Sequence, residues 1–214
     1  MNGAGLRLEG LRVAAGGATL AALDAHVAPG EALTVMGPSG VGKSTLLAAV
    51  IGAAPRAFTV TGRVWLDGRD VSALPTEARR IGLMDQDAQL CPHLSVGANL
   101  AFGLPPEIRG RAARRARVAE ALAAAGLSGM AERDPATLSG GQRARAALMR
   151  ALLAAPRALL LDEPFSGLDA AMRDRIRRFV FDRARAEGLP TLLVTHDAAD
   201  AAAAGGRVVT LGAA

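Results

Sequence analysis

The chain has 214 residues, half of them hydrophobic, and its charged residues make up 21% of the total. This composition excludes wholesale disorder and suits one α/β domain or two small ones. Cys91 is the only cysteine, which excludes an internal disulfide and a zinc site built from several cysteines, and fits a reducing cytoplasm.

The net charge of +5 permits an acidic partner such as nucleic acid, anionic lipid or a nucleotide. The densest basic run, residues 109–117, alternates arginine with alanine at helical spacing and contains no aromatic side chain. We favour the interpretation that these arginines solvate a helix face, and we expect no nucleic-acid partner.

The apolar stretches predict neither a secretion signal nor a membrane span. The first ten residues lack the apolar region of a signal peptide. A bilayer span needs about 20 apolar residues, whereas the alanine run 198–204 is shorter and contains Asp200. We therefore expect a protein that is soluble or peripheral to a membrane.

The first half of the chain predicts strands around one helix. Residues 6–13 and 20–28 alternate apolar and polar side chains, as half-exposed strands do. The apolar run 32–36 predicts a buried strand that enters a glycine-rich loop, and residues 43–52 predict a helix. Another strand is expected over 61–67, followed by a hairpin-type turn at Asp67 and Gly68.

The second half predicts buried strands that alternate with helices. Residues 76–86 contain a short helix and a strand over 81–84, and residues 94–134 are helical with breaks at 103–106 and at Gly126. The remaining predicted elements are helices over 141–154 and 170–187 and strands over 158–161, 189–195 and 207–211. This alternation indicates an α/β fold whose parallel sheet is covered on both faces.

Residues 37–44 (Gly-Pro-Ser-Gly-Val-Gly-Lys-Ser) form a complete P-loop between a strand and a helix. Glycines let the backbone N–H groups converge on phosphate oxygens, and the helix N-terminus adds partial positive charge. Lys43 is the only lysine among 25 basic residues, as expected where a compact ammonium fits and a planar guanidinium does not. We expect Lys43 to reach the β- and γ-phosphates and Ser44 to ligate Mg²⁺. The expected nucleotide-binding residues are Gly37, Pro38, Ser39, Gly40, Val41, Gly42, Lys43, Ser44 and Thr45.

Two carboxylates follow the apolar strand 158–161. Asp162 and Glu163 emerge at its carboxyl end, and in open α/β sheets ligands bind at that edge. Asp162 is expected to hold the Mg²⁺ shell, and Glu163 lies one residue further, where it can polarise an attacking water. An acidic turn after a strand is the alternative interpretation, which the P-loop makes the weaker one.

Residues 138–142 (Leu-Ser-Gly-Gly-Gln) precede a helical run, so they present backbone donors at a helix N-terminus. The pattern alone predicts an anion site. It does not say which anion binds there.

The chain resembles ABC ATPases, in which the same motifs follow one another in the same order. The resemblance covers nearly the whole chain, from about residue 6 to 211. Residues 138–142 resemble the signature motif, residues 166–169 the D-loop, Gln86 the Q-loop and His196 the switch histidine. The resemblance implies a P-loop NTPase core with a mostly parallel sheet, a small N-terminal antiparallel β-subdomain and an inserted α-helical subdomain. It also implies that two subunits form a homodimer on ATP binding, with two ATP molecules sandwiched head to tail.

Individual roles also follow from this resemblance. The implied catalytic residues are Glu163, His196 and Gln86, and the implied Mg²⁺ ligands are Ser44, Gln86 and Asp162. The implied ATP contacts beyond the P-loop are Ser139, Gly140, Gly141, Gln142 and Asp169. The implied cofactors are ATP and Mg²⁺.

The branch of the family is indicated by two segments. Residues 86–104 and 139–145 are similar to bacterial importer ATPases for thiamine, iron, sulfate or polyamines, and residues 134–145 resemble a thiamine-importer-like group labelled YnjD. The resemblance implies a motor subunit that energises import of a small solute. Its implied partners are integral-membrane permease subunits and a periplasmic solute-binding protein. The implied location is cytoplasmic, on the inner face of the cell membrane.

Three other functions remain open at this point. An exporter or lipid-release ATPase is one, although such members usually carry Glu where this chain has Gln142. A non-transport ABC ATPase acting on nucleic acid or ribosomes is another, but it normally brings a second ATPase unit, a coiled-coil insertion or zinc cysteines. A catalytically inactive binding module is the third. The intact set Lys43, Ser44, Asp162, Glu163 and His196 argues against that one.

Two departures from the family pattern are visible. Members usually place an aromatic residue about twenty residues before the P-loop to stack on adenine, but this chain has none around Val13, Ala14 and Ala15. Arg12 is the alternative cover for the ring, through a cation–π contact. The second departure is that we expect no C-terminal regulatory domain. The chain is expected to form a single nucleotide-binding domain over 1–214, with a helical subdomain at about 88–155.

The remaining histidines and the single tryptophan have predicted roles too. His26 is expected on the surface, and His93 is equally consistent with a surface residue and with a contact to the membrane partner. Trp65 is expected to pack on the small antiparallel sheet rather than to stack on a ligand.

Overall fold

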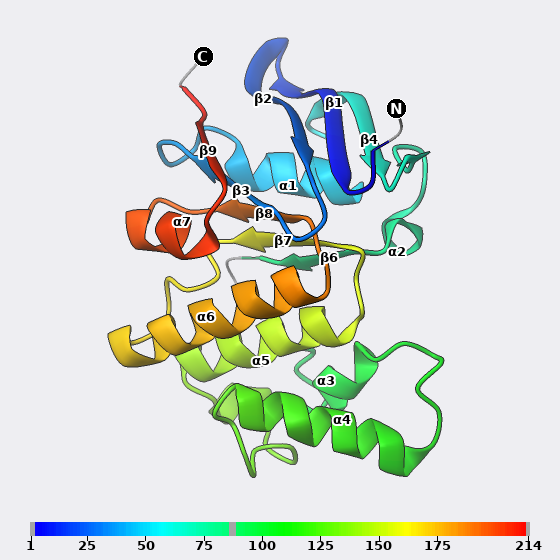
Figure 1. Ribbon diagram of the computed structural model, residues 1–214, viewed down its shortest axis with the longest axis vertical. Coiled ribbons are helices and arrows are strands. Elements are labelled where there is room, and N and C mark those ends of the chain that lie inside the picture. The colour runs from blue at the N-terminus through cyan, green and yellow to red at the C-terminus, as the bar shows by residue number, and fades with distance from the viewer. Residues whose placement is uncertain (1–2, 86–88, 213–214) are drawn as a thin grey trace. The chain divides into compact units, whose positions relative to one another are not determined.

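The structure is a computed structural model that describes residues 3–85 and 89–212 (Figure 1). The chain forms two compact units. The first contains residues 1–83, 157–163 and 181–214, and the second contains residues 84–156 and 164–180. The segment 88–155, predicted as a helical subdomain, falls inside the second unit, which also takes in 164–180.

An antiparallel sheet in the first unit has the strand order β2-β1-β4-β5. Its strands are β1 (Leu6–Ala15), β2 (Ala18–Val27), β4 (Thr59–Leu66) and β5 (Arg69–Asp70). Burial alternates along β1 and β2, so that Leu6 and Leu8 are buried while Arg7 is exposed. The period-two pattern of the sequence therefore gave the correct strand type.

The second sheet has five strands in the order β6-β7-β8-β3-β9. They are β6 (Ile81–Met84), β7 (Ala158–Asp162), β8 (Thr191–Val194), β3 (Ala32–Met36) and β9 (Arg207–Thr210). Strand β3 runs parallel to β8 and β9, and β7 runs parallel to β8. All residues of β7 and β8 are buried, which explains their continuous apolar sequences. The predicted mixed α/β fold with a parallel sheet and a separate antiparallel sheet is confirmed.

The helices are α1 (Lys43–Ile51), α2 (Thr76–Arg79), α3 (Val96–Phe102), α4 (Arg111–Ala124), α5 (Gly140–Leu153), α6 (Ala170–Ala186) and α7 (Ala198–Ala204), with a 3₁₀ turn at Pro135–Thr137. The sequence does not predict helix α7, because its alanine run has no alternation of apolar and polar side chains. Asp197 caps it by accepting a hydrogen bond from the Ala199 amide at 2.7 Å. Within the described residues, no helix is both long and apolar enough to cross a membrane.

The core of the first unit lies around α1. Buried side chains from β1, β2, β3, α1, β7 and β8 form one apolar cluster, and Figure 1 shows α1 between the two sheets. Arg79, only 6% exposed, closes the carboxyl end of α1 by donating to the carbonyls of Val50 at 2.7 Å and Ala49 at 3.3 Å. A cation at this position satisfies helix carbonyls and complements the negative end of the helix dipole.

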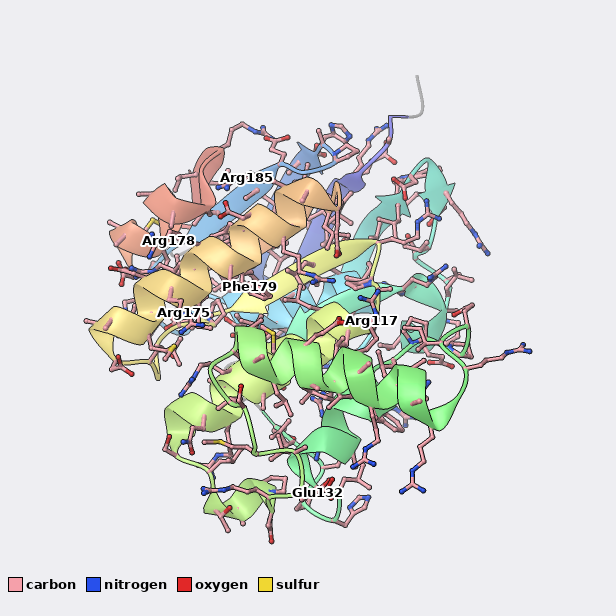
Figure 2. The ribbon with its side chains drawn as sticks, turned by 60° about the horizontal axis from the view of Figure 1, so that its bottom comes forward. Arg117, Glu132, Arg175, Arg178, Phe179 and Arg185 are labelled. Atoms are coloured by element: carbon pink, nitrogen blue, oxygen red, sulfur yellow. The ribbon has the colours of Figure 1, made fainter. Side chains whose placement is uncertain are left out.

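Many of the arginines that give the chain its positive charge lie on exposed faces of helices. Figure 2 shows Arg175, Arg178 and Arg185 on α6 and Arg117 on α4. Arg185 pairs with Asp182 at 2.8 Å, and Arg117 pairs with Glu120 at 3.3 Å, in each case one helical turn away. Such pairs stabilise a solvated helix face by a few tenths of a kilocalorie per mole at most.

Candidate active site

Three adjacent strands of the parallel sheet bring the P-loop, Asp162 and the predicted catalytic residues Glu163 and His196 to one edge. Strands β3, β7 and β8 are neighbours and run in the same direction, so their carboxyl ends lie together. The P-loop follows β3, Asp162 ends β7 and is followed by Glu163, and His196 follows β8. All of these residues belong to the first unit. Ligands bind at this edge in open α/β sheets.

The ammonium group of Lys43 lies over the start of the P-loop. Its Nζ donates to the carbonyl oxygens of Gly37 and Pro38, both at 2.8 Å, and the residue is 8% exposed. Ser39 and Gly40 are exposed at the outer side of the same loop. The loop therefore curls around a fixed positive charge and leaves its own outer backbone accessible.

Helix α1 begins without a side-chain cap. Its N-cap residue Gly42 has φ 90°, a left-handed conformation that glycine adopts without strain, and no acidic residue lies in the first turn. A Cβ atom at Gly42 would lie 3.3 Å from the Cβ atoms of Leu20 and Ala21, so β2 passes close to the loop. Ser44 is exposed and Thr45 half-buried in the first helical turn. Uncapped backbone donors with this charge are suited to an anion.

Asp162 and Glu163 differ in environment. Asp162 is 5% exposed and is the last residue of β7. Glu163 has φ 47°, and its amide donates to the Val194 carbonyl of β8 at 2.9 Å. A left-handed conformation at a residue other than glycine is strained, and such residues concentrate at functional sites.

His196 contacts Glu163 directly. Its Nδ1 lies 2.9 Å from both carboxylate oxygens of Glu163. The hydrogen bond to Glu163 and the charge of that carboxylate raise the pKa of His196, with smaller contributions from Asp197 and Asp200. The structure thus joins the two residues that the sequence proposed as general base and switch histidine.

The predicted signature motif begins helix α5 in the second unit. Ser139 is its N-cap, and its hydroxyl accepts from the Gln142 amide at 3.3 Å, while the Gln142 side chain accepts from the Ser139 amide at 3.0 Å. This capping box satisfies two donors and fixes the start of the helix. Ser139 and Gly140 are exposed, so the end of the helix is accessible.

The predicted D-loop lies beside the signature glycines in the same unit. A Cβ atom at Gly141 would lie 3.1 Å from the Gly167 carbonyl oxygen, so only glycine allows this approach without displacement. Asp169 accepts from the Met172 amide at 3.0 Å and thereby caps α6. Gln86 lies outside the described residues.

Sequence reasoning missed two residues that hold these loops. Arg145, 9% exposed, donates to the carbonyls of Gly141 at 3.2 Å and Ala125 at 2.6 Å. Asp200, 4% exposed, accepts from the Thr195 hydroxyl at 2.8 Å beside His196. The spacing of arginines and aspartates along helices carries no signal for such contacts. Only burial distinguishes these two from the solvated charges around them.

Comparison with known proteins assigns the family. The family described as ABC transporter matches residues 20–166 of this chain. The chain belongs to the ABC transporter family. This confirms the ABC ATPase resemblance that the motif order had indicated, and with it an ABC-type ATPase fold.

Three curated relatives cover most of this chain, and two of them are named as import proteins. The ABC transporter ATP-binding protein YnjD of Escherichia coli is 54% identical over 171 residues, covering 80% of this chain and 78% of that protein. The thiamine import ATP-binding protein ThiQ of Cereibacter sphaeroides is 46% identical, covering 92% and 83%. The Fe(3+) ions import ATP-binding protein FbpC of Streptomyces coelicolor is 49% identical, and this chain spans 96% of its own length but 59% of that protein.

Solved structures agree with the family assignment. The dimeric post-hydrolysis structure of the ATP-binding cassette MJ0796, bound to ADP and Pi, superposes with a TM-score of 0.85 at 29% identity, covering 97% of this chain and 96% of that one. A second dimeric structure of MJ0796, called a bacterial ABC transporter cassette, has a TM-score of 0.84 at 30% identity.

Proposed function

We propose that this chain is the ATP-hydrolysing motor subunit of an importer for a small solute. The proposal rests on one observation above all. Lys43, Asp162, Glu163 and His196 gather at the carboxyl ends of three adjacent parallel strands of one compact unit. The relatives that carry the names of iron and thiamine import proteins support import over export.

The P-loop is the proposed triphosphate site. In the proposed complex the Lys43 ammonium exchanges its contacts with the Gly37 and Pro38 carbonyls for phosphate oxygens, which are stronger acceptors. The uncapped amides at the start of α1 add donors aimed at the same anion. Residues 37–45 supply these contacts in our proposal.

The oxygen donors near the loop fit Mg²⁺. Ser44 supplies a hydroxyl and Asp162 a carboxylate, and Gln86 is a third proposed ligand outside the described residues. Mg²⁺ takes few protein ligands and completes its shell with phosphate oxygens and waters. Among the described residues no group of three or more His, Cys, Asp or Glu side chains is placed to hold a metal ion. When bound, Mg²⁺ neutralises charge that develops on the phosphates.

Glu163 is the proposed general base. Its carboxylate accepts a proton from water as the water oxygen bonds to the γ-phosphorus and the bond from that phosphorus to the bridging oxygen breaks. ATP and water thus give ADP and inorganic phosphate. His196, already within hydrogen-bond distance of Glu163, is proposed to donate its ring N–H to a γ-phosphate oxygen.

A second copy of the chain is proposed to complete each site. The accessible start of α5 offers backbone donors beside Ser139, Gly140, Gly141 and Gln142, with Asp169 near the same loop in the second unit. The dimeric structures of MJ0796 support this arrangement. In the proposal the two units act together as one nucleotide-binding domain.

The membrane permease is proposed to contact α3 and the loop before it. Phe102, 76% exposed, is the most exposed large apolar side chain among the described residues, and His93 is exposed on the preceding loop. Asn99, wholly buried, holds that loop by accepting from the Cys91 amide at 2.7 Å and donating to the Cys91 and Leu94 carbonyls. A loop held by hydrogen bonds beside an exposed aromatic side chain suits a docking surface. We propose that the subunit works on the cytoplasmic face of the membrane, with a periplasmic solute-binding protein in the same system.

An ATPase assay on the purified chain tests the proposal. We expect release of inorganic phosphate that depends on both ATP and Mg²⁺ and is lost in Lys43→Ala, because the point charge on the β- and γ-phosphates is removed. Phosphate release by Lys43→Ala at the unmodified rate would refute the proposed site. Stimulation of the rate by co-purified permease would support the transport role.

A further inference from the structure

The position of His196 depends on its neighbours in the chain. Its side chain is 70% exposed, so little packing surrounds the ring. An imidazole has two rotatable bonds, and its reach is set by where the backbone places its Cα atom. The residues on either side of His196 therefore decide whether the ring meets Glu163.

Thr195 is fixed from three directions. Its amide donates to the Val35 carbonyl of β3 at 3.3 Å, and its hydroxyl donates to Asp200 Oδ2 at 2.8 Å. The same hydroxyl oxygen accepts from the Asp197 amide at 3.1 Å. Thr195 is 1% exposed and Asp200 4% exposed. The turn that carries His196 is thus tied both to the P-loop strand and to helix α7.

Asp200 is well suited to anchor the turn. It lies in the first turn of α7, where the helix dipole stabilises a negative charge. A buried carboxylate needs hydrogen-bond donors, because an unsatisfied one is costly. The Thr195 hydroxyl therefore cannot turn away without leaving Asp200 with one donor fewer.

We propose that Thr195 and Asp200 are positioning residues that set the distance of the His196 ring from Glu163 and from the γ-phosphate. The inference rests on the proposed function, since it concerns how that site is assembled. A displacement of about 1 Å in a catalytic group can cost about a hundredfold in rate. A single buried hydrogen bond next to the histidine can therefore control hydrolysis.

A purely structural role is the competing explanation. In that case the pair only holds α7 against the sheet, and its loss lowers stability without a specific effect on the site. The same strand offers a matched control. Thr191 is also 1% exposed, and its hydroxyl donates to the Leu189 carbonyl at 3.2 Å, four residues before Thr195.

The first experiment compares Thr195→Val, Thr195→Ser and Thr191→Val by steady-state ATP hydrolysis in Mg²⁺. We expect Thr195→Val to lower kcat about tenfold or more with the KM for ATP within about twofold, because the P-loop is intact. Thr195→Ser keeps the hydroxyl and should restore kcat. Thr191→Val should lose stability comparably and keep the kcat of the unmodified chain.

The second measurement follows the histidine itself. The chain has three histidines, so the His196 ring resonance can be assigned with His196→Ala and titrated by NMR. In Thr195→Val the pKa of His196 should fall toward its ordinary value, because the ring leaves the Glu163 carboxylate that raises it. Thr191→Val should leave that pKa where it is. Loss of kcat without the pKa change, or the pKa change without loss of kcat, contradicts the proposal.

If Thr195→Val does not fold, Asp200→Asn and Asp200→Ala make the same comparison. Both remove the charge, but only asparagine keeps an oxygen that accepts from Thr195. A kcat in Asp200→Ala equal to that in Asp200→Asn overturns the proposal. His196→Ala tests the two proposals separately. If His196→Ala hydrolyses ATP at the unmodified rate, the proposed role of His196 is wrong. If His196→Ala is impaired and Thr195→Val is not, only the positioning proposal is wrong.

Discussion

His196 Nδ1 lies 2.9 Å from both carboxylate oxygens of Glu163. The contact connects residues that follow β7 and β8, neighbouring strands of the parallel sheet. Glu163 is 18% exposed in its side chain and His196 is 70% exposed. The Glu163 side chain is therefore largely buried at the edge of the sheet, whereas the His196 side chain is mostly exposed to solvent.

This contact predicts a pH dependence of stability. The pKa of His196 is raised in the folded chain, so protonated His196 binds Glu163 and stabilises the fold. The contribution is fully present below the ordinary pKa of histidine and is lost as pH rises through the raised value. Thermal midpoints of the chain and of His196→Ala, measured from pH 5 to 9, should therefore differ at low pH and converge at high pH. A difference that grows as pH rises would contradict this sign.

Replacement of the proposed general base, Glu163, is predicted to slow hydrolysis without preventing ATP binding. Glu163→Gln keeps the shape of the side chain and loses the carboxylate, so hydrolysis should fall about a hundredfold or more while Mg-ATP still binds. The variant should also accumulate an ATP-dependent dimer by sedimentation. Glu187→Gln, which removes a half-exposed carboxylate paired with Arg183, is the control and should leave hydrolysis unchanged. Rapid turnover by Glu163→Gln would remove Glu163 from its role.

The local motifs were more predictable than the contacts that hold them. The buried strands and the P-loop could be predicted because apolar runs and glycine spacing are local signals. The contact between His196 and Glu163 joins residues 33 positions apart, and it follows only from the pairing of β7 with β8. The role of Arg145 was missed because one of its carbonyl acceptors, Ala125, lies 20 positions earlier in the chain, at the end of α4.

A buried hydroxyl in β3 offers a test of stability. Thr34 is wholly buried, and among the described residues its Oγ1 has no hydrogen-bond partner. An unsatisfied buried hydroxyl costs about 1–3 kcal/mol. Thr34→Val should therefore raise the free energy of unfolding and the thermal midpoint, whereas Thr191→Val, which loses a hydrogen bond to Leu189, should lower both. A fall in the midpoint of Thr34→Val would show that the hydroxyl has a partner.

Replacement of Arg145 is predicted to weaken dimer formation and to leave ATP binding by the monomer unchanged. It connects the Gly141 carbonyl of the signature motif to the Ala125 carbonyl at the end of α4. Lysine cannot span both acceptors with a planar fork. In the Glu163→Gln background, Arg145→Lys should weaken ATP-dependent dimerisation about tenfold (about 1.4 kcal/mol) while ATP binding by the monomer is unchanged. Arg114→Lys is the control, since Arg114 holds the Ala101 and Ile108 carbonyls in the same unit.

The side chains of the β1–β2 hairpin predict that the chain discriminates only weakly between adenine and guanine nucleotides. Ala15 pairs with Ala18 across a turn of two glycines, and Leu20 lies against the P-loop at Gly42. Stacking of a base on an aromatic side chain contributes about 1–3 kcal/mol, and these small and aliphatic side chains do not supply it. The phosphates do not distinguish purines, so GTP should bind and be hydrolysed nearly as well as ATP. Competition of ATP and GTP for the purified chain measures this ratio.

Adding the stack should restore selection. Ala15→Tyr, or Ala14→Tyr at the neighbouring position, should tighten ATP binding about 5- to 150-fold, the equivalent of 1–3 kcal/mol. Ala22→Tyr is the matched control, since Ala22 is exposed on β2 opposite Arg12. A tenfold or larger preference of the unmodified chain for ATP would mean that another group reads the base. Arg12 would then be the first candidate, because its guanidinium can cover a ring by cation–π contact, and Arg12→Ala would abolish the preference.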